Sequence, residues 1–377
     1  MKTVVVLGAG MVGNAIARDL YGQYLVTSVD SDAERLIPLK THYPIQTLQA
    51  DLSDPKQIQG IVRSADLVIG ALPGHMGFES LKTVIASGKN TVDISFFSED
   101  PFDLDAAAKR KNVTAIVDCG VAPGMSNMIL GYHQTSMAVE SFECFVGGLP
   151  FARNWPYQYK APFSPIDVLE EYTRPARIVV NGNVVTRPAL SEPELVEFGG
   201  IGTLEAFNTD GLRTLLKTMS VPDMKEKTLR YPGHIELIRV LRETGFLDKH
   251  PVEIDGVQIR PLDLTTRLLF PKWKLGENEP EFTAMKITLR GRKNDRYTEI
   301  VYRLFDQSDL VARISSMART TGYTCTAVAR LVLEGRWNRK GIVPPEWIGA
   351  VPDCFEGVMA ELKGKNIRIT VEEPATG

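Results

Sequence analysis

Cysteine and histidine are scarce in this sequence. Its 377 residues include only four cysteines and five histidines. The cysteines, Cys119, Cys144, Cys325 and Cys354, lie far apart, with no C-x-x-C pair and no cysteine–histidine cluster at the spacing of zinc ligands. We therefore expect reduced thiols, each packed as a small buried hydrophobe, and no metal site.

Long apolar runs and an excess of positive charge are also lacking. No run approaches the roughly 18–20 apolar residues that a membrane span needs. The apolar stretch after Lys2, Thr3–Leu7, is shorter than the roughly 7–15 residues of a secretory signal. Acidic residues number 46 and basic residues 43, which argues against nucleic-acid binding because such proteins normally carry a basic face. We expect a cytoplasmic protein that binds neither membranes nor nucleic acid.

The chain is long enough for two domains of roughly 100–200 residues each. Its hydrophobic fraction of 44% and charged fraction of 24% are typical of a globular enzyme. Residues 1–125 alternate short β-branched runs with helix-length segments, a pattern typical of βαβ units on a parallel sheet. We predict a doubly wound α/β Rossmann domain with strands at Thr3–Leu7, Leu25–Val29, Ile45–Leu48, Leu67–Gly70, Asn90–Ile94 and Thr114–Val117.

The pattern changes after about Met125. Prolines and aromatics cluster in Leu149–Pro165, a segment too interrupted for one regular element. The stretch Ala176–Val185 has alternating hydrophobicity around the dipeptide Asn181-Gly182, which indicates a hairpin. The second part of the chain therefore mixes strands and irregular segments.

Two further strands are expected at Phe282–Leu289 and Thr298–Phe305, joined by the polar turn Arg290–Arg296. We predict that residues 126–334 form an α+β domain with a mixed sheet, for substrate binding and dimerisation. We expect residues 335–377 to complete the Rossmann domain, because a parallel sheet needs cover on both faces.

The strongest motif is a G-x-G-x-x-G formed by Gly8, Gly10 and Gly13, directly after a predicted strand and before a predicted helix. The first glycine permits the tight turn, the second allows a pyrophosphate to approach, and the third lets helix and strand pack closely. Asp30 follows Gly10 by 20 positions, where a carboxylate accepts from ribose hydroxyls and favours NAD over NADP. The alternative is a sharp turn with Asp30 as a helix cap.

Two later loops support a dinucleotide site, because ligands of open α/β sheets lie at the carboxyl ends of strands. Asp51-Leu52 follows the third predicted strand and Ala71–Gly74 follows the fourth. A purely structural role for Asp51 stays open. The expected contacts of NAD are Gly8, Ala9, Gly10, Met11, Val12, Gly13, Asp30, Asp51, Leu52, Leu72, Pro73, Ser95 and Val121.

Several ordered motifs run over nearly the whole length of the chain. They are the glycine segment from Gly8, Gly88–Ser95, Gly120–Ser126, Gly147–Pro150, Glu171–Arg177, Leu204–Arg213, Thr228–His234 and Ala318–Tyr323. In these motifs the chain resembles the saccharopine dehydrogenase/reductase superfamily, and more closely its lysine 6-dehydrogenase branch. The resemblance implies a Rossmann domain, an α+β catalytic domain whose sheet helps form a homodimer, and a small amino-acid substrate.

Three departures from the resemblance bear on the substrate. Relatives that act on saccharopine carry Tyr at the position of Phe96, Asp at that of Ala122, and Arg at that of Asp210. An Arg-to-Asp change replaces a site for an anion with a site for a cation. The resemblance thus implies NAD-dependent oxidative deamination of L-lysine at the ε-carbon, giving the 6-semialdehyde, which cyclises, and ammonia.

Two other functions stay open. One is a reductase that condenses an amine with a carbonyl compound, as saccharopine and carboxynorspermidine relatives do. The other is a non-catalytic dinucleotide sensor. NADH formation from lysine alone favours the deamination, whereas turnover that needs both an aldehyde and an amino acid favours the condensation.

Hydride transfer from an amine needs a base, because the nitrogen must first lose a proton. The candidates are Asp93, Asp210 and His234. Asp93 ends the fifth predicted strand, and its alternative is a buried carboxylate that caps the next loop. Asp210 is also a candidate partner of the substrate ammonium or a helix cap. His234 has the alternative of an ordinary polar residue at a helix start.

The substrate carboxylate needs a cation. Arg230 is the leading candidate, because the family uses the Thr228–Tyr231 segment for substrate and a guanidinium binds a carboxylate with two hydrogen bonds. Thr228 belongs to the same segment. Tyr172 and Arg174 are further candidates, with an ion pair that anchors the chain as their alternative.

Overall fold

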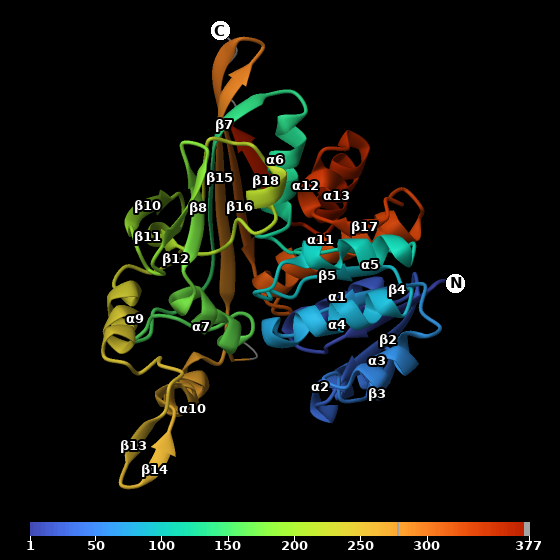
Figure 1. Cartoon of the computed structure of the whole chain (residues 1–377), viewed down its shortest axis with the longest axis horizontal. Helices are drawn as coiled ribbons and strands as arrows, with labels where there is room; N and C mark the ends of the chain where they lie inside the picture. The colour runs from blue at the N-terminus through green and yellow to red at the C-terminus, as the bar shows by residue number, and fades with distance from the viewer. Residues whose placement is uncertain (277–278, 373–377) are drawn as a thin grey trace. The chain divides into compact units, whose positions relative to one another are not determined.

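The computed structural model describes residues 1–276 and 279–372 (Figure 1). The chain divides into two compact units, each assembled from segments that are distant in the sequence. The first unit contains Met1–Val139, Arg292–Arg296 and Met317–Ile369, and the second contains Glu140–Gly291, Tyr297–Ser316 and the segment from Thr370 on.

The first unit contains a parallel sheet of seven strands in the order β17-β6-β5-β4-β1-β2-β3. Val4, Val5, Val6 and Leu7 of β1 are all buried, because helices cover both faces of such a sheet. This confirms the predicted doubly wound α/β fold. The strands are β1 (Thr3–Leu7), β2 (Leu25–Asp30), β3 (Gln46–Gln49), β4 (Leu67–Gly70), β5 (Thr91–Asp93), β6 (Thr114–Ile116) and β17 (Gly341–Val343).

Aspartates start several helices of this unit. The side chains of Asp32, Asp54 and Asp100 each accept a hydrogen bond from the backbone N–H two residues on, which satisfies one of the unpaired donors of the first turn. The helices are α1 (Met11–Leu20), α2 (Ala33–His42), α3 (Pro55–Val62), α4 (Gly74–Ala86), η1 (Pro101–Leu104), α5 (Asp105–Arg110), α6 (Met125–Gln134), α11 (Ser316–Leu333), α12 (Pro345–Gly349) and α13 (Pro352–Gly364).

The second unit contains a mixed sheet in the order β10-β11-β12-β7-β15-β16-β18, with β8 paired to β12 and β9. The strands β12 and β7 are parallel, whereas β10, β11 and β12 run antiparallel in turn. The strands are β7 (Ala138–Pro150), β8 (Ala176–Val180), β9 (Asn183–Arg187), β10 (Glu194–Phe198), β11 (Gly202–Asn208), β12 (Asp223–Arg230), β15 (Glu281–Lys293), β16 (Arg296–Gln307) and β18 (Ile369–Glu372).

Turn residues set both predicted hairpins of this unit. Asn181 and Gly182 have φ values of 49° and 78° and join β8 to β9, as expected. The loop between β15 and β16 is shorter than the expected Arg290–Arg296, because Asn294 and Asp295 both adopt positive φ and reverse the chain within two residues. The remaining elements are α7 (Pro165–Thr173), α8 (Leu215–Thr218), α9 (His234–Glu243), α10 (Pro261–Trp273) and a separate hairpin of β13 (Val252–Ile254) and β14 (Val257–Ile259).

The unit boundaries differ from those expected. α6 and most of α11 belong to the first unit rather than to an independent segment 126–334. A buried ion pair links α11 to α1: Arg330 donates from two nitrogens to Asp19 of α1, each at 3.0 Å, and the Thr326 hydroxyl donates to the same carboxylate. Of the segment 335–377 that was expected to complete the Rossmann domain, the part up to Ile369 belongs to the first unit, and its strand β17 pairs with β6 in the parallel sheet. The strand β18 instead pairs with β16 in the second sheet.

No helix in the described part of the chain is both long and apolar enough to cross a membrane.

Candidate functional site

In the glycine loop after β1, an added side chain would clash at Gly8 and Gly13 but would have space at Gly10. A side chain at Gly8, whose φ is +104°, would lie 2.3 Å from the carbonyl oxygen of Ala71, and one at Gly13 would lie 2.0 Å from that of Gly8. At Gly10 the nearest atom to an added Cβ is a guanidinium nitrogen of Arg35, at 4.0 Å. α1 begins directly after Gly10, and no side chain caps it. The open position beside a helix N-terminus fits a pyrophosphate.

Asp30 ties the glycine loop to the end of β2. One of its carboxylate oxygens accepts a 2.7 Å hydrogen bond from the Ala9 N–H, and the other accepts one of 2.9 Å from the Asp32 N–H. The N-cap of α2 is Asp32, so the alternative of Asp30 as the helix cap is wrong. Arg35 lies beside this carboxylate, with a nitrogen 3.8 Å from Asp30 and another 3.4 Å from Asp32. The end of β2 therefore carries both acid and guanidinium.

The loops after β3 and β4 offer few side chains to the candidate dinucleotide site. Asp51 is exposed and accepts from both the N–H and the hydroxyl of Ser53, which lowers the pKa of the Asp51 carboxyl. The Leu52 side chain is buried in the core beneath β1, and Leu72 packs against the same cluster. Pro73 precedes the first residue of α4. A side-chain contact with a ligand is therefore open to Asp51 and not to Leu52.

Asp93 is buried at the carboxyl end of β5. One oxygen accepts a 2.7 Å hydrogen bond from the Ser95 N–H, and a Cβ at Gly70 would lie 1.8 Å from the other. The Ser95 hydroxyl is buried and has no hydrogen-bond partner among the described residues. Burial, followed by the charges of Asp118 and Asp93, raises the pKa of Cys119 and so disfavours its reactive thiolate form. Val121, two residues after Cys119, is also buried.

In the second unit, Arg230 lies at the end of β12 and is 1% exposed. Its guanidinium donates to the Tyr172 hydroxyl at 2.9 Å, to the Leu229 carbonyl at 2.9 Å and to Glu171 at 2.6 Å. It also lies 4.4 Å from the ring centre of Tyr159, a cation–π contact. This enclosed guanidinium has its own counter-ion. The arrangement does not fit the expected role of Arg230 as an open anchor for a substrate carboxylate.

His234 begins α9 in the same cluster and is also 1% exposed. Its Nε2 lies 2.9 Å from the Tyr172 hydroxyl, and its Nδ1 lies 2.8 Å from the Tyr157 carbonyl. Burial, followed by the positive charge of Arg230, lowers the pKa of His234 to about 3. The ring is thus neutral, so Nδ1 donates to the carbonyl and Nε2 accepts from Tyr172. Both nitrogens are engaged, which leaves no acceptor for a substrate proton.

Asp210 is paired within the protein. Its two carboxylate oxygens accept from Nε and Nη2 of Arg177, at 2.8 and 2.7 Å, and one also accepts from the Arg177 backbone N–H. Arg177 already neutralises the Asp210 carboxylate, and this pair does not favour the expected contact of Asp210 with a substrate ammonium. The helix-cap alternative fails too, since α8 begins after Thr214.

Two other predicted substrate residues have structural contacts. Arg174, the residue after α7, lies 3.5 Å from Glu170 of that helix, so this ion pair joins residues only four apart in the sequence. The Thr228 hydroxyl donates to the hydroxyl of Thr209 at 3.1 Å and is buried. The structure brings together the predicted substrate residues Tyr172 and Arg230 and the predicted base candidate His234.

Sequence reasoning missed Glu171, Arg177 and Trp273 as parts of these clusters. Glu171 pairs with Arg230 from 59 positions away, and Arg177 pairs with Asp210 from 33 positions away. Trp273 is buried, with its ring centre 6.4 Å from that of His234. Glu171 could have been noticed because it directly precedes Tyr172. No local sequence pattern, however, identifies partners that are 33 or 59 positions apart.

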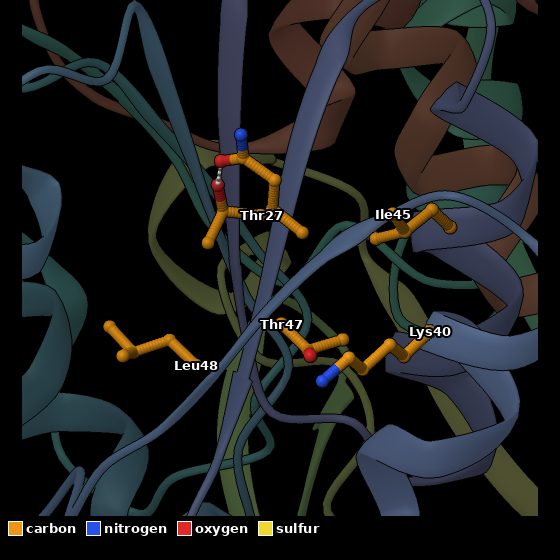
Figure 2. Close-up of a pocket in the computed structure, with 6 residues that line it drawn as sticks. Thr27, Lys40, Ile45, Thr47 and Leu48 are labelled. Carbon is orange, nitrogen blue, oxygen red and sulfur yellow. Dashed lines mark hydrogen bonds between the residues drawn. The ribbon is translucent and has the colours of Figure 1, made fainter.

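A surface cavity of about 420 Å³ lies elsewhere, at the edge strand β3 of the first unit (Figure 2). The Thr27 hydroxyl donates to the Gln46 side chain across it, and Lys40 provides its charged group. None of the predicted site residues lines this cavity. Its lining residues are Thr27, Lys40, Ile45, Gln46, Thr47 and Leu48.

Comparison with known proteins gives the family. Residues 4–116 match the saccharopine dehydrogenase NADP binding domain, and residues 120–367 match the saccharopine dehydrogenase C-terminal domain. The chain belongs to the saccharopine dehydrogenase family. The matches confirm the predicted family but give no support to the lysine 6-dehydrogenase branch in particular.

Individual relatives agree with this. The saccharopine dehydrogenase [NADP(+), L-glutamate-forming] of Saccharomyces cerevisiae is 22% identical, over 97% of each chain. The mitochondrial alpha-aminoadipic semialdehyde synthase of Rattus norvegicus is 26% identical over 69% of this chain, which spans only 30% of that protein. A solved apo structure of the Saccharomyces cerevisiae saccharopine dehydrogenase (L-Glu forming) has a TM-score of 0.80 at 19% identity and covers both chains fully. This likeness shows that the folds are the same.

Proposed function

We propose that the chain is an NAD(P)-dependent oxidoreductase that joins or separates an amino acid and a carbonyl compound through a secondary amine. The pair of Asp210 and Arg177 carries this proposal. Arg177 neutralises the carboxylate while its own side chain stays 42% exposed, so the site offers a guanidinium to an anion. Saccharopine carries a glutamate arm with extra carboxylates, whereas free lysine ends in an ammonium. The family membership supports the same reaction class.

The proposed reaction requires a hydride acceptor and a base, and both would be provided at the first unit. In the oxidative direction a bound nicotinamide would supply the acceptor for the hydride that leaves the carbon bonded to nitrogen. The nitrogen must first lose its proton to a base, since only a free lone pair can assist the departing hydride. Asp93 is the remaining candidate, because it ends a strand of the parallel sheet at the edge where ligands of such sheets lie. Water then adds to the imine, which separates into amine and carbonyl.

The dinucleotide would bind along the carboxyl ends of the strands in the first unit. The backbone N–H groups from Gly10 to Gly13 would bind the pyrophosphate beside the open position at Gly10. The buried carboxylate of Asp30 supports NAD over NADP, because it repels a 2′-phosphate. Arg35 opposes that preference, because a guanidinium 3.8 Å from the carboxylate attracts the same phosphate. We infer that NAD binds more tightly and that NADP is not excluded. Asp51, the loop from Leu72 to Pro73, Ser95 and Val121 stay proposed contacts.

The second unit would hold the amino-acid part of the substrate. Arg177 is the proposed contact of a carboxylate there. Arg230, Tyr172 and His234 are proposed as positioning residues, because each bonds to another member of the buried cluster. Their hydrogen bonds run in one direction, from Arg230 to Tyr172 to His234, and so fix the orientation of all three side chains.

Oxidative deamination of L-lysine is the second candidate. Phe96 and Ala122 favour it, because the residues that saccharopine-acting relatives carry at these positions are absent. Under this alternative Arg177 would hold the α-carboxylate of lysine.

A substrate panel tests both proposals. Purified protein is given lysine, ornithine or saccharopine with NAD or NADP, and lysine plus a keto acid or semialdehyde with the reduced dinucleotides, and the nicotinamide absorbance is followed. We expect turnover with saccharopine-like secondary amines and with the two-substrate mixture. Turnover of lysine alone would support the second candidate, and binding of the dinucleotide without any turnover would refute both. Arg177→Ala should raise KM for the substrate at least tenfold, while the matched exposed variant Arg187→Ala should not.

A further inference from the structure

The parallel sheet of the first unit has one covered edge and one open edge (Figure 1). The strand β17 forms the first edge, and all three of its residues are buried. The strand β3 forms the second edge, where Gln46, Leu48 and Gln49 are exposed and Thr47 is half-buried. No described strand other than β2 pairs with β3. The outer side of β3 is therefore accessible to another molecule.

The open edge presents backbone hydrogen-bonding groups at Thr47 and Gln49. The Ala50 N–H donates to the Asp30 carbonyl at the end of β2. In a parallel ladder the residues that bond to one neighbouring strand alternate along the chain, so Leu48 also bonds toward β2. The N–H and C=O groups of Thr47 and Gln49 consequently point away from β2. Such a row of groups is a template for the backbone of another extended chain.

The sequence of β3 lacks the residues that usually protect an edge strand. Gln-Thr-Leu-Gln contains no charged residue and no proline, which proteins place on exposed edges to prevent pairing with other chains. The strands at the two ends of the second sheet, β10 and β18, carry Glu194 and Glu372 instead. The edge at β3 is therefore less protected against an added strand than these two.

The cavity of about 420 Å³ described above lies along this edge. Side chains alternate between the two faces of a strand. Gln46 and Leu48 point to one face, together with Thr27, which pairs with Gln46. Thr47 points to the opposite face, and the Lys40 side chain extends toward it from α2 (Figure 2). Because residues on both faces line the cavity, it lies beside the strand, where an added strand would continue the sheet.

Two lining residues determine which side chains an added strand should carry. The Lys40 ammonium has no ion-pair partner among the described residues, so it is available to a carboxylate on its face of the sheet. On the other face Leu48 is 42% exposed and offers an apolar contact. Successive residues of an added strand point to opposite faces. An acidic residue followed by an apolar one therefore complements both positions.

We propose that the edge of β3 binds an extended peptide segment of another protein, in which acidic and apolar residues alternate. The segment adds to the parallel sheet as a further strand, with backbone hydrogen bonds to Thr47 and Gln49. An acidic side chain contacts Lys40, and its apolar neighbour contacts Leu48. The inference concerns docking alone, so it does not depend on the proposed reaction.

Fluorescence anisotropy with the full-length chain tests the proposal. The probe is a capped, fluorescein-labelled peptide of alternating valine and glutamate, and its control has lysine in place of glutamate. We expect saturable binding of the acidic peptide at micromolar concentrations and at least about tenfold weaker binding of the basic one. The formal net charge of −3 makes this order informative, because general attraction would favour the basic peptide. Amide hydrogen exchange should show that the bound acidic peptide protects residues 43–50.

Two pairs of variants separate the backbone contribution from the side-chain contribution. Thr47→Pro removes an N–H that points away from β2 and should weaken binding of the acidic peptide at least about fivefold. Thr47→Val keeps that N–H and should bind within about twofold of the unaltered chain. Lys40→Glu should weaken binding at least about tenfold. Its control is Lys111→Glu, which reverses an exposed charge after α5 and should not.

Thermal unfolding verifies that each variant folds. The proposal would be overturned by a lack of saturable binding of the acidic peptide, by equal binding of the two peptides, or by unchanged affinity in both Thr47→Pro and Lys40→Glu. Protection of residues 43–50 that grows with protein concentration in the absence of peptide would show that a second copy of the chain covers the edge, and would overturn it as well.

Discussion

The glycine loop of the first unit and the Arg230 cluster of the second differ in how they are built. The loop is a single run of six residues, and its important groups are backbone N–H donors at the start of α1, which no side chain caps. The cluster joins side chains from three separate segments, and its charged group is almost fully enclosed. A local backbone site is thus ready for a ligand, whereas a buried side-chain site mainly satisfies its own members.

The comparison predicts that the buried Arg230 contributes much more to the free energy of unfolding than the exposed Arg35. Arg230→Met keeps much of the volume but leaves Glu171 without its counter-ion, and burial already raises the pKa of that carboxyl despite Arg230. We expect a loss of about 3–5 kcal/mol of unfolding free energy, the usual cost of breaking a buried pair. Urea unfolding at neutral pH measures it. Exposed Arg35, replaced in the same way, should change stability by less than about 0.5 kcal/mol; equal effects of the two variants would contradict the contrast.

In the glycine loop a side chain should affect binding and not folding. Gly10→Val fills the open position, so we expect dinucleotide affinity to fall about 100-fold, or roughly 2.7 kcal/mol, with a nearly unchanged melting temperature. Calorimetric titration with NAD measures the affinity. Gly60→Ala in α3 is the control, because a Cβ there meets no atom within 4 Å. A large loss of stability in Gly10→Val would show that this position is structural.

The end of β2 should determine which dinucleotide binds. Asp30→Ala removes both the acceptor for ribose and the bond to the Ala9 N–H, so NAD should bind about tenfold more weakly, or roughly 1.4 kcal/mol, and the preference over NADP should shrink. Arg35→Ala should weaken NADP and spare NAD. The dissociation constants of both dinucleotides test this pair of variants. An unchanged ratio in Asp30→Ala would remove the ribose assignment.

His234 should make stability depend on pH. Its pKa of about 3 in the folded chain lies below the usual value near 6.5, so the unfolded chain binds the proton more readily between these values. The contribution of neutral His234 to the free energy of unfolding is therefore fully present above about pH 6.5. It is lost as the pH drops toward 3, by up to about 1.4 kcal/mol per pH unit. Unfolding at several pH values should show this slope in the unaltered chain and a shallower one in His234→Gln. The exposed His75→Gln should leave the slope unchanged.

Where the sequence predicted correctly, the signal was local. The motif at Gly8, the strand-length apolar runs and the Asn181-Gly182 turn each depend on neighbouring residues, and the parallel sheet and hairpin follow from them. The domain boundaries were harder to predict. α11 joins the first unit through contacts such as the ion pair between Arg330 and Asp19, which are 311 residues apart in the sequence.

The sequence by itself determined the doubly wound sheet, the dinucleotide loop and the family, because periodicity and backbone conformation are properties of short segments. Only the tertiary structure decided what the charged candidates do. From the sequence alone, Asp210 is a candidate site for a cation, but in the structure it is paired with Arg177. Arg230 is likewise a candidate substrate anchor, but in the structure it is bonded to Glu171 and Tyr172. The physical reason is that the net charge and accessibility of a side chain depend on partners brought together by folding.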